Sequence, residues 1–308
     1  MIYGNDWQRS FYQTNNMNMK IYRASLLSAL TCELGEGACW WRERNSWCWV
    51  DILGYSIYMR DVNCFQQRFD TGDYVTTLAP VAGRDELVAG IKDGIAFFSP
   101  EQGMSSRIAV LEKRSQVRCN DGKCDPAGRL WIGTMQMPPE EGTGNLYCIS
   151  GKTAPELKLA GVTISNGLVW TGNKMYYNDT HTRTVQQFSY DASTGAITFT
   201  RVAIHIPPEL GWPDGMAIDG EGMLWIAHWG GYGVYRWNPA TGELLGKVEM
   251  PAPHVSSCAF GGPGMDEMLI TTAREHMTAA QIAEYPLSGS VFHVRLPIKG
   301  LPANYFKY

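Results

Sequence analysis

Charged residues are scarce in this sequence, and no long basic run occurs. Only 18% of the 308 residues are charged, and 26 basic residues against 30 acidic ones give a net charge of −4. A protein that binds nucleic acid or anionic lipid normally carries a basic patch. The composition therefore argues against a nucleic-acid partner and favours a small-molecule ligand.

Long apolar segments are missing as well. No run approaches the roughly 20 residues that a membrane helix needs, so no membrane partner is expected. The first residues, MIYGNDWQRSFYQTNNMNMK, lack the cationic start and apolar middle of a secretory signal. We interpret residues 1–20 as a flexible extension and residues 21–308 as one folded domain, a monomer or weak homo-oligomer.

Common signatures of cysteine and nucleotide chemistry are also absent. There is no C-x-x-C pair, no G-x-S-x-G nucleophile motif, no P-loop and no dinucleotide-binding glycine motif. The scattered cysteines favour buried, reduced thiols in a cytoplasmic protein over disulfides or a thiolate zinc site. They are Cys32, Cys39, Cys48, Cys64, Cys119, Cys124, Cys148 and Cys258.

Histidine likewise shows no metal-binding spacing such as H-x-x-x-H, so the histidines are expected at the surface or in packing roles. Those considered are His181, His205, His228, His254 and His276.

What the chain does contain is glycine, aromatic residues and a repeated pattern. Its 33 glycines and 12% aromatic content favour short strands joined by tight turns. The stretch NDGKCDPAGRLWIGTM at 120–135 is similar to PDGMAIDGEGMLWIAHW at 213–229, and Trp131 aligns with Trp225. Asn120 falls on Asp214 in this alignment, so each copy has a polar residue at the same place.

The pattern extends through the chain as six units. A polar anchor residue precedes a strand core by about eleven positions in each unit, and successive anchors are 40 to 48 residues apart, the period of a propeller blade. The alternation within each unit suits antiparallel strands. The sequence therefore predicts a six-bladed β-propeller, all-β, with four antiparallel strands per blade. The anchors are Glu36, Thr76, Asn120, Asn166, Asp214 and Ser257.

Rotation about the propeller axis would bring all six anchors to a central channel. Any single anchor is also explained by ordinary turn chemistry. Glu36, Asn166 and Asp214, however, would bring two carboxylates and an amide onto one axis. Their oxygens would repel one another unless a cation lay between them. Such oxygen ligands suit one divalent ion, Ca²⁺, Mg²⁺ or Mn²⁺, with zinc or iron as further options. Three protein ligands leave positions open for water or substrate.

At this point the sequence resembles the regucalcin/gluconolactonase family, also called the senescence marker protein family, of six-bladed propeller lactonases. The resembling motifs are LGEGACWW at 34–41, RCNDGKCDPAGRLWIGTM at 118–135, ISNGLVW at 164–170, GWPDGMAID at 211–219 and SSCAFGG at 256–262. The resemblance implies the same three metal ligands, Glu36, Asn166 and Asp214. It further implies that Arg118 and Asn120 contact substrate hydroxyls.

The resemblance implies metal-dependent hydrolysis of a sugar lactone to its aldonic acid. In that reaction the ion polarises the lactone carbonyl and activates water, and Asp214 is expected to accept the proton of the water as general base. A non-catalytic propeller that binds calcium or a protein partner is the alternative function. A lactone panel read by acid release separates the two.

One position departs from the family pattern. Family members that act on six-carbon sugar acids often carry an acidic residue just after G-T-M, where this chain has Gln136 and Met137 followed by Pro138 and Pro139. A carboxylate from the following Glu140 or Glu141 is one expectation, and loss of that sugar contact is the other.

Overall fold

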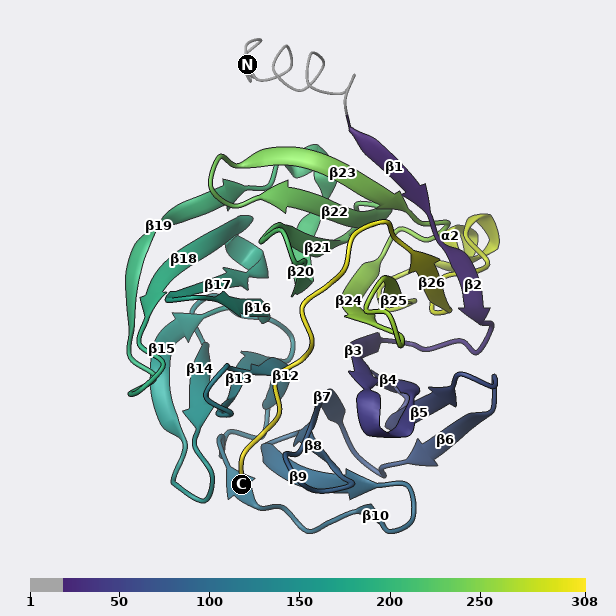
Figure 1. The fold of residues 1–308 in the computed structure, drawn as a ribbon. Coiled ribbons are helices and arrows are strands. Elements are labelled where there is room, and N and C mark those ends of the chain that lie inside the picture. The colour runs from purple at the N-terminus through teal and green to yellow at the C-terminus, as the bar shows by residue number, and fades with distance from the viewer. Residues whose placement is uncertain (1–18) are drawn as a thin grey trace.

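Six sheets stand as blades round a central channel in the computed structural model, which describes residues 19–308 (Figure 1). Each blade contains four strands that pair antiparallel in sequence order from the channel outwards, except where the N-terminal strands join. The predicted six-bladed β-propeller is therefore confirmed. Of the predicted extension at residues 1–20, the first eighteen residues lie outside the described residues, and a strand already begins at Lys20.

The first three blades follow one another along the chain. Blade 1 contains β3 (Gly35–Trp41), β4 (Ser46–Asp51), β5 (Ser56–Asp61) and β6 (Gln66–Asp70). Blade 2 contains β7 (Val75–Pro80), β8 (Leu87–Ile91), β9 (Gly94–Ser99) and β10 (Gly103–Met104), with β11 (Ala109–Val110) also paired to β9. Blade 3 contains β12 (Val117–Cys124), β13 (Leu130–Gln136), β14 (Gly144–Ile149) and β15 (Glu156–Val162).

The last three blades complete the circle. Blade 4 contains β16 (Ser165–Thr171), β17 (Lys174–Asp179), β18 (Thr184–Tyr190) and β19 (Ile197–His205). Blade 5 contains β20 (Trp212–Ile218), β21 (Leu224–Trp229), β22 (Gly233–Asn238) and β23 (Glu243–Glu249). Blade 6 contains β24 (Val255–Gly261), β25 (Glu267–Thr272) and β26 (Val291–Arg295). Short helices lie between strands: η1 (Arg42–Arg44), η2 (Thr180–Thr182), η3 (Pro208–Leu210) and α2 (Ala279–Glu284).

The N-terminal segment closes the ring. β2 (Ser25–Ser28) supplies the fourth, outermost strand of blade 6 by pairing antiparallel with β26. β1 (Lys20–Arg23) adds a fifth strand to blade 5, parallel to β23. The repeat pattern did not predict either pairing, because these short strands carry no copy of the repeat.

Apolar side chains fill the spaces between blades. The buried apolar residues form six clusters, and each cluster joins one pair of neighbouring blades, blades 6 and 1 included. Burial of this surface is the main stabilising contribution to such a ring. Seven of the eight cysteines lie within the buried residues as predicted, whereas Cys64 is exposed at a turn, and all eight are free thiols.

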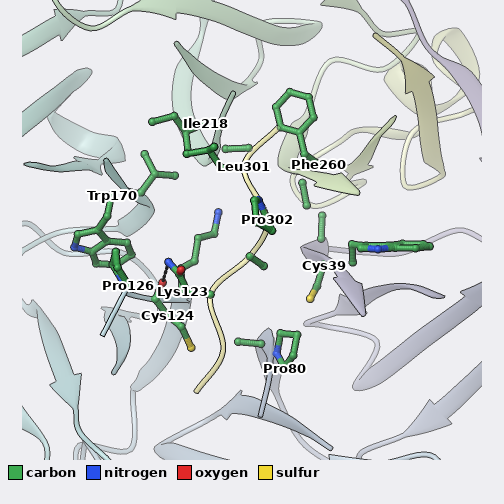
Figure 2. Close-up of a pocket in the computed structure, with 18 of the residues that line it drawn as sticks. Cys39, Pro80, Lys123, Cys124, Pro126, Trp170, Ile218, Phe260, Leu301 and Pro302 are labelled. Atoms are coloured by element: carbon green, nitrogen blue, oxygen red, sulfur yellow. Dashed lines mark hydrogen bonds between the residues drawn. The ribbon is translucent and has the colours of Figure 1, made fainter. Parts of the chain in front are cut away.

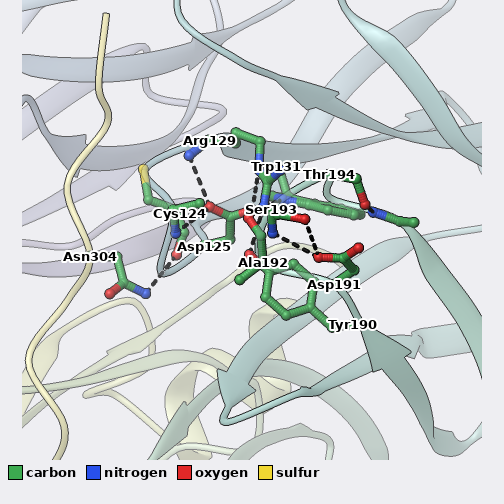
Figure 3. Close-up of polar contacts among 12 residues, drawn as sticks. Cys124, Asp125, Arg129, Trp131, Tyr190, Asp191, Ala192, Ser193, Thr194 and Asn304 are labelled. Carbon is green, nitrogen blue, oxygen red and sulfur yellow. Dashed lines mark hydrogen bonds and ion pairs between the residues drawn. The ribbon is translucent and has the colours of Figure 1, made fainter.

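The repeated D-x-x-G-x-L-W pattern forms the same buried network twice. In blade 3 the Asp125 carboxylate accepts hydrogen bonds from Trp131 Nε1 at 2.9 Å and Arg129 Nε at 2.7 Å (Figure 3). In blade 5 Asp219 accepts from Trp225 Nε1 at 2.9 Å and from the Arg236 guanidinium. Each aspartate also caps its own turn by accepting backbone N–H groups. This part of the repeat is therefore structural.

The C-terminal segment crosses one end of the channel as a strap, residues 300–306 (Figure 1). Its backbone bonds to opposite blades, with Leu301 N donating to Ile218 O at 3.1 Å and Phe306 N donating to Pro80 O at 2.8 Å. Under the strap lies a cavity of about 340 Å³, into which the Lys123 side chain extends (Figure 2). This end of the channel is lined by the C-terminal halves of the innermost strands.

Candidate functional site

A second cavity of about 540 Å³ opens at the other end of the channel, where the innermost strands begin. All five residues that the sequence singled out line it: Glu36, Arg118, Asn120, Asn166 and Asp214. They come from four different innermost strands, β3, β12, β16 and β20, and each is buried to between 4% and 7% exposure. The structure thus brings the predicted site residues together.

Irregular backbone at the start of each innermost strand directs these side chains. The pairing register shifts between Glu36 and Cys39 in β3, between Ser165 and Leu168 in β16, and between Pro213 and Met216 in β20. A bulge of this kind lets a side chain leave the regular alternation of a strand. The site residues therefore face the channel while the rest of each strand packs between blades.

Two anchors behave differently from the prediction. Thr76 and Ser257 are buried, but neither is among the residues that line the cavity. The Ser257 side chain packs against the backbone of Gly215 in the neighbouring blade, and the Thr76 side chain packs beside Gly90. The expected ring of six converging side chains is therefore wrong for these two blades.

Burial and like charge strongly perturb the two carboxylates. Loss of solvent and the negative charge of Asp121 raise the pKa of Glu36 to about 8. Burial first, and then the charge of Glu36, raise the pKa of Asp214 well above its ordinary value. In addition, Asp214 Oδ1 is buried without a hydrogen-bond partner among residues 19–308. A buried carboxylate oxygen without a hydrogen-bond partner lowers the stability of the folded protein. A stabilising role therefore does not explain why Asp214 occupies this position.

The amide of Asn166 is held in a fixed orientation. Asn166 Nδ2 donates to Thr180 Oγ1 at 2.8 Å, and Thr180 Oγ1 in turn donates to Pro213 O at 2.8 Å. Asn166 Oδ1 accepts a bond from Asn120 Nδ2 at 3.1 Å and keeps one further lone pair. The hydroxyl of Thr180 thus ties the amide of blade 4 to the backbone next to Asp214.

Arg118 and Asn120 form one unit. Arg118 Nη1 donates to Asn120 Oδ1 at 2.5 Å and to Cys119 O at 2.9 Å. Asn120 Nδ2 donates both to Ser165 O at 2.8 Å and to Asn166 Oδ1. Both amide protons of Asn120 are therefore occupied, and its side chain can only accept a bond from a ligand. Among the described residues these bonds use Nη1 of Arg118, which leaves Nε and Nη2 for a ligand.

The loop after G-T-M forms one wall of the cavity. Met137, Pro138 and Pro139 line it, whereas Glu140 and Glu141 are exposed and lie outside the lining. The Glu140 carboxylate accepts a bond from Gln136 Nε2 at 2.6 Å. Neither glutamate places a carboxylate in the cavity in this structure.

Several lining residues were not found from the sequence. Glu275 lies between β25 and β26 of blade 6, and its negative charge acts on Glu36, Arg118 and Asp214, although the anchor pattern gives no signal there. His181 and His276 lie at the surface, as expected, but their position in the lining of the cavity was not predicted. Both are exposed to solvent. Trp212 and Trp229 add aromatic surface, with Trp229 stacked on His254 at 4.3 Å.

The donor set fits a divalent cation. Within residues 19–308 no group of three or more His, Cys, Asp or Glu side chains is arranged for a metal ion. The expected set contains two carboxylates and one amide oxygen, which are ligands of hard cations. The unpaired Asp214 Oδ1 and the repulsion that acts between Glu36 and Asp214 are both relieved when a cation lies between these oxygens. Glu36, Asn166 and Asp214 are thus the residues suited to hold it.

The fold and the site place this chain among the six-bladed propellers that carry a polar cavity on the propeller axis. Comparison of the sequence with models of known families then identifies its family. A family model described as "SMP-30/Gluconolactonase/LRE-like region" matches residues 34–274. The chain therefore belongs to the SMP-30/gluconolactonase/LRE-like family. This agrees with the resemblance seen in the sequence motifs.

Individual relatives extend the comparison over most of the chain. YvrE of Bacillus subtilis, named as a candidate sugar lactone lactonase, is 35% identical over 271 residues, 87% of this chain and 92% of YvrE. Regucalcin of Danio rerio is 34% identical over 277 residues, 88% of this chain and 93% of that protein. The crystal structure of regucalcin from Agrobacterium tumefaciens, described as a calcium-binding protein, superposes with a TM-score of 0.88 at 26% identity, covering 94% and 99% of the two chains.

Proposed function

We propose that this protein is a metal-dependent lactonase that hydrolyses a sugar lactone to the aldonic acid. The observation that carries the proposal is the buried Asp214 carboxylate, which has an unpaired Oδ1 and faces the same cavity as Glu36, Asn166 and Arg118. Membership of a family that includes gluconolactonases, and similarity to YvrE, support the reaction class.

Glu36, Asn166 and Asp214 would hold one divalent ion, which supplies Lewis acidity toward a carbonyl and lowers the pKa of water when bound. Calcium, zinc, magnesium, manganese and iron are all compatible with this donor set. Asp214 would also serve as general base, because its carboxylate lines the cavity beside the residues that would hold the ion, where the attacking water would bind. Asp214 would take one proton from the water as the water oxygen bonds to the acyl carbon, and would return that proton to the ring oxygen as the acyl C–O bond breaks, giving the hydroxy acid.

Arg118 orients the substrate in this proposal. Arg118 lines the cavity, its Nε and Nη2 are not used by the bonds described above, and a guanidinium donates to hydroxyl oxygens in a fixed plane. Asn120 fixes the orientation of the guanidinium by accepting a hydrogen bond from Arg118 Nη1. It also donates a hydrogen bond to the amide oxygen of Asn166. Asn120 therefore serves partly as a positioning residue, with one remaining lone pair on Oδ1 for a substrate hydroxyl.

A propeller that binds calcium or a protein partner without catalysis is the competing function. It would use the same oxygen ligands but would have no need of a buried guanidinium beside them. Within residues 19–308 no helix is long and apolar enough to cross a membrane. The cytoplasmic location and the monomeric or weakly oligomeric state remain predictions.

The test is acid release from a lactone panel after chelation and after addition of each divalent ion. We expect hydrolysis only with metal, and we expect Glu36→Gln to abolish it. Thr76→Val is the matched control, because Thr76 is the equivalent anchor of blade 2, lies outside the cavity and has an unpaired Oγ1. Metal binding without hydrolysis of any lactone would establish the competing function.

A further inference from the structure

The cavity has two chemically different parts. Its inner end carries the buried polar residues at the starts of the innermost strands. The rest of the lining is apolar over much of its extent, and includes Met135, Met137, Pro138, Pro139, Ile164 and Trp212. A site built to surround a fully hydroxylated chain would place hydrogen-bonding groups along both parts.

Few polar groups at the inner end are left for hydroxyls. The hydroxyl of Thr180 uses its proton for Pro213 O and one lone pair for Asn166 Nδ2, and both amide protons of Asn120 are occupied. Among the described residues, the groups that remain are Arg118 Nε and Nη2, one lone pair each of Asn120 and Thr180, and the nearby carboxylate of Glu275. These suffice for the two or three hydroxyls next to a lactone carbonyl.

The loop wall offers no N–H group to a ligand. Met137 N donates to Gln116 O at 2.7 Å, and Pro138 and Pro139 have no N–H. The one polar side chain at the start of the loop, Gln136, bonds to the exposed Glu140 outside the cavity. His181 and His276 are the polar side chains at the rim, and both are exposed to solvent.

We propose that the site selects sugar lactones whose exocyclic side chain ends in a methyl group, that is, deoxy-sugar lactones. This inference rests on the proposed lactonase function. The ring hydroxyls meet Arg118, Asn120 and Glu275, while the end of the side chain meets the apolar wall. A methyl group there buries apolar surface against Met135, Met137 and Trp212, whereas a terminal hydroxyl meets no hydrogen-bonding group on the loop wall.

The decisive measurement compares two lactones of the same ring size and stereochemistry, 6-deoxy-galactono-1,4-lactone and galactono-1,4-lactone. These differ only in a terminal CH₃ or CH₂OH. With the metal that supports activity, we expect kcat/KM to be at least about tenfold higher for the deoxy compound. Equal values, or a preference for galactonolactone, would overturn the inference and leave the lactonase function standing. If no lactone of the panel is hydrolysed, the proposed function fails and the inference fails with it.

Substitution of Met137 tests whether the wall sets this preference. Met137→Glu places a carboxylate beside the terminal carbon, so we expect the ratio of the two kcat/KM values to fall at least about tenfold, mainly through KM for galactonolactone. Met137→Leu is the matched control, and the ratio should stay within about twofold of wild type because the side chain remains apolar. An unchanged ratio in folded Met137→Glu, checked by near-ultraviolet circular dichroism, would show that this wall does not determine the preference.

Discussion

Replacing Asp214 with asparagine is predicted to raise stability and abolish activity at once. The Asp214 side chain is only 5% exposed, its Oδ1 has no partner among the described residues, and the charge of Glu36 acts against its own. Asparagine keeps the shape and removes the charge. Removal of a desolvated charge that Glu36 repels contributes about 1 to 3 kcal/mol, so the metal-free variant should unfold at a temperature a few degrees higher than the metal-free wild type.

Metal should reverse this order of stability. A ligand at a hundredfold excess over its Kd stabilises the native state by about 2.7 kcal/mol, and only the wild type keeps the full ligand set. Lactone hydrolysis should fall at least about 10³-fold in Asp214→Asn, because electrophilic assistance and the general base are lost together. Thermal unfolding with chelator and with added metal, alongside acid release, measures all three quantities.

Asp179→Asn is the matched control for this prediction. Asp179 is also buried, but its carboxylate accepts backbone N–H bonds from Thr163 at 2.8 Å and Ile164 at 2.9 Å. The same change there should lower the melting temperature, because charge-assisted bonds are weakened. The reasoning is refuted if metal-free Asp214→Asn melts below wild type, or if added metal stabilises both proteins equally.

Three other predictions follow from the site and the core. Arg118→Ala should lower kcat/KM by about 1 to 3 kcal/mol, while metal affinity measured by calorimetry changes little; a collapse of metal binding would contradict the assigned role. Five-carbon aldonolactones should be hydrolysed at least as well as gluconolactone, since no loop carboxylate lines the cavity; a tenfold preference for gluconolactone argues against this. Burial lowers the pKa of His228 from its ordinary 6.5 to about 3. Below pH 6.5 the unfolded chain therefore takes up a proton that the native state does not, and stability falls by about 1.4 kcal/mol per pH unit. Urea unfolding between pH 6.5 and 4.5 should show a shallower fall in His228→Gln, and an identical fall in both proteins would exclude this histidine as the cause.

The repeat could be read from the sequence because every blade needs the same local structure. Trp131 and Trp225 occupy equivalent strands, and each donates a hydrogen bond to the aspartate that caps the preceding turn. Because both blades need this contact, the repeat remains recognisable in the amino-acid sequence. Glu36, Asn166 and Asp214 could be found because they begin innermost strands. Their direction toward the cavity depends on bulges, which leave no clear signal in composition.

Other features depend on long-range contacts that the sequence does not display. Glu275 belongs to the segment between β25 and β26, and its backbone N–H donates to Glu33 O at 2.9 Å, a contact across 242 residues of sequence that holds it at the cavity. Thr76 and Ser257 satisfy the anchor pattern, yet their small side chains pack against neighbouring backbone and do not reach the cavity. A repeat therefore identifies equivalent positions, while side-chain length and local packing decide which of them reach a ligand.

The pairing of β2 with β26 has a consequence for biosynthesis. Ser25 contacts His293 across 268 residues, so the fourth strand of blade 6 is made before blades 1 to 5 and its partner, β26, is made after them. A nascent chain can assemble blades 1 to 4 while translation continues, but blade 6 stays incomplete until β26 has left the ribosome. Because unpaired strand edges recruit other strands, the interval before ring closure is when newly made chains are most exposed to aggregation.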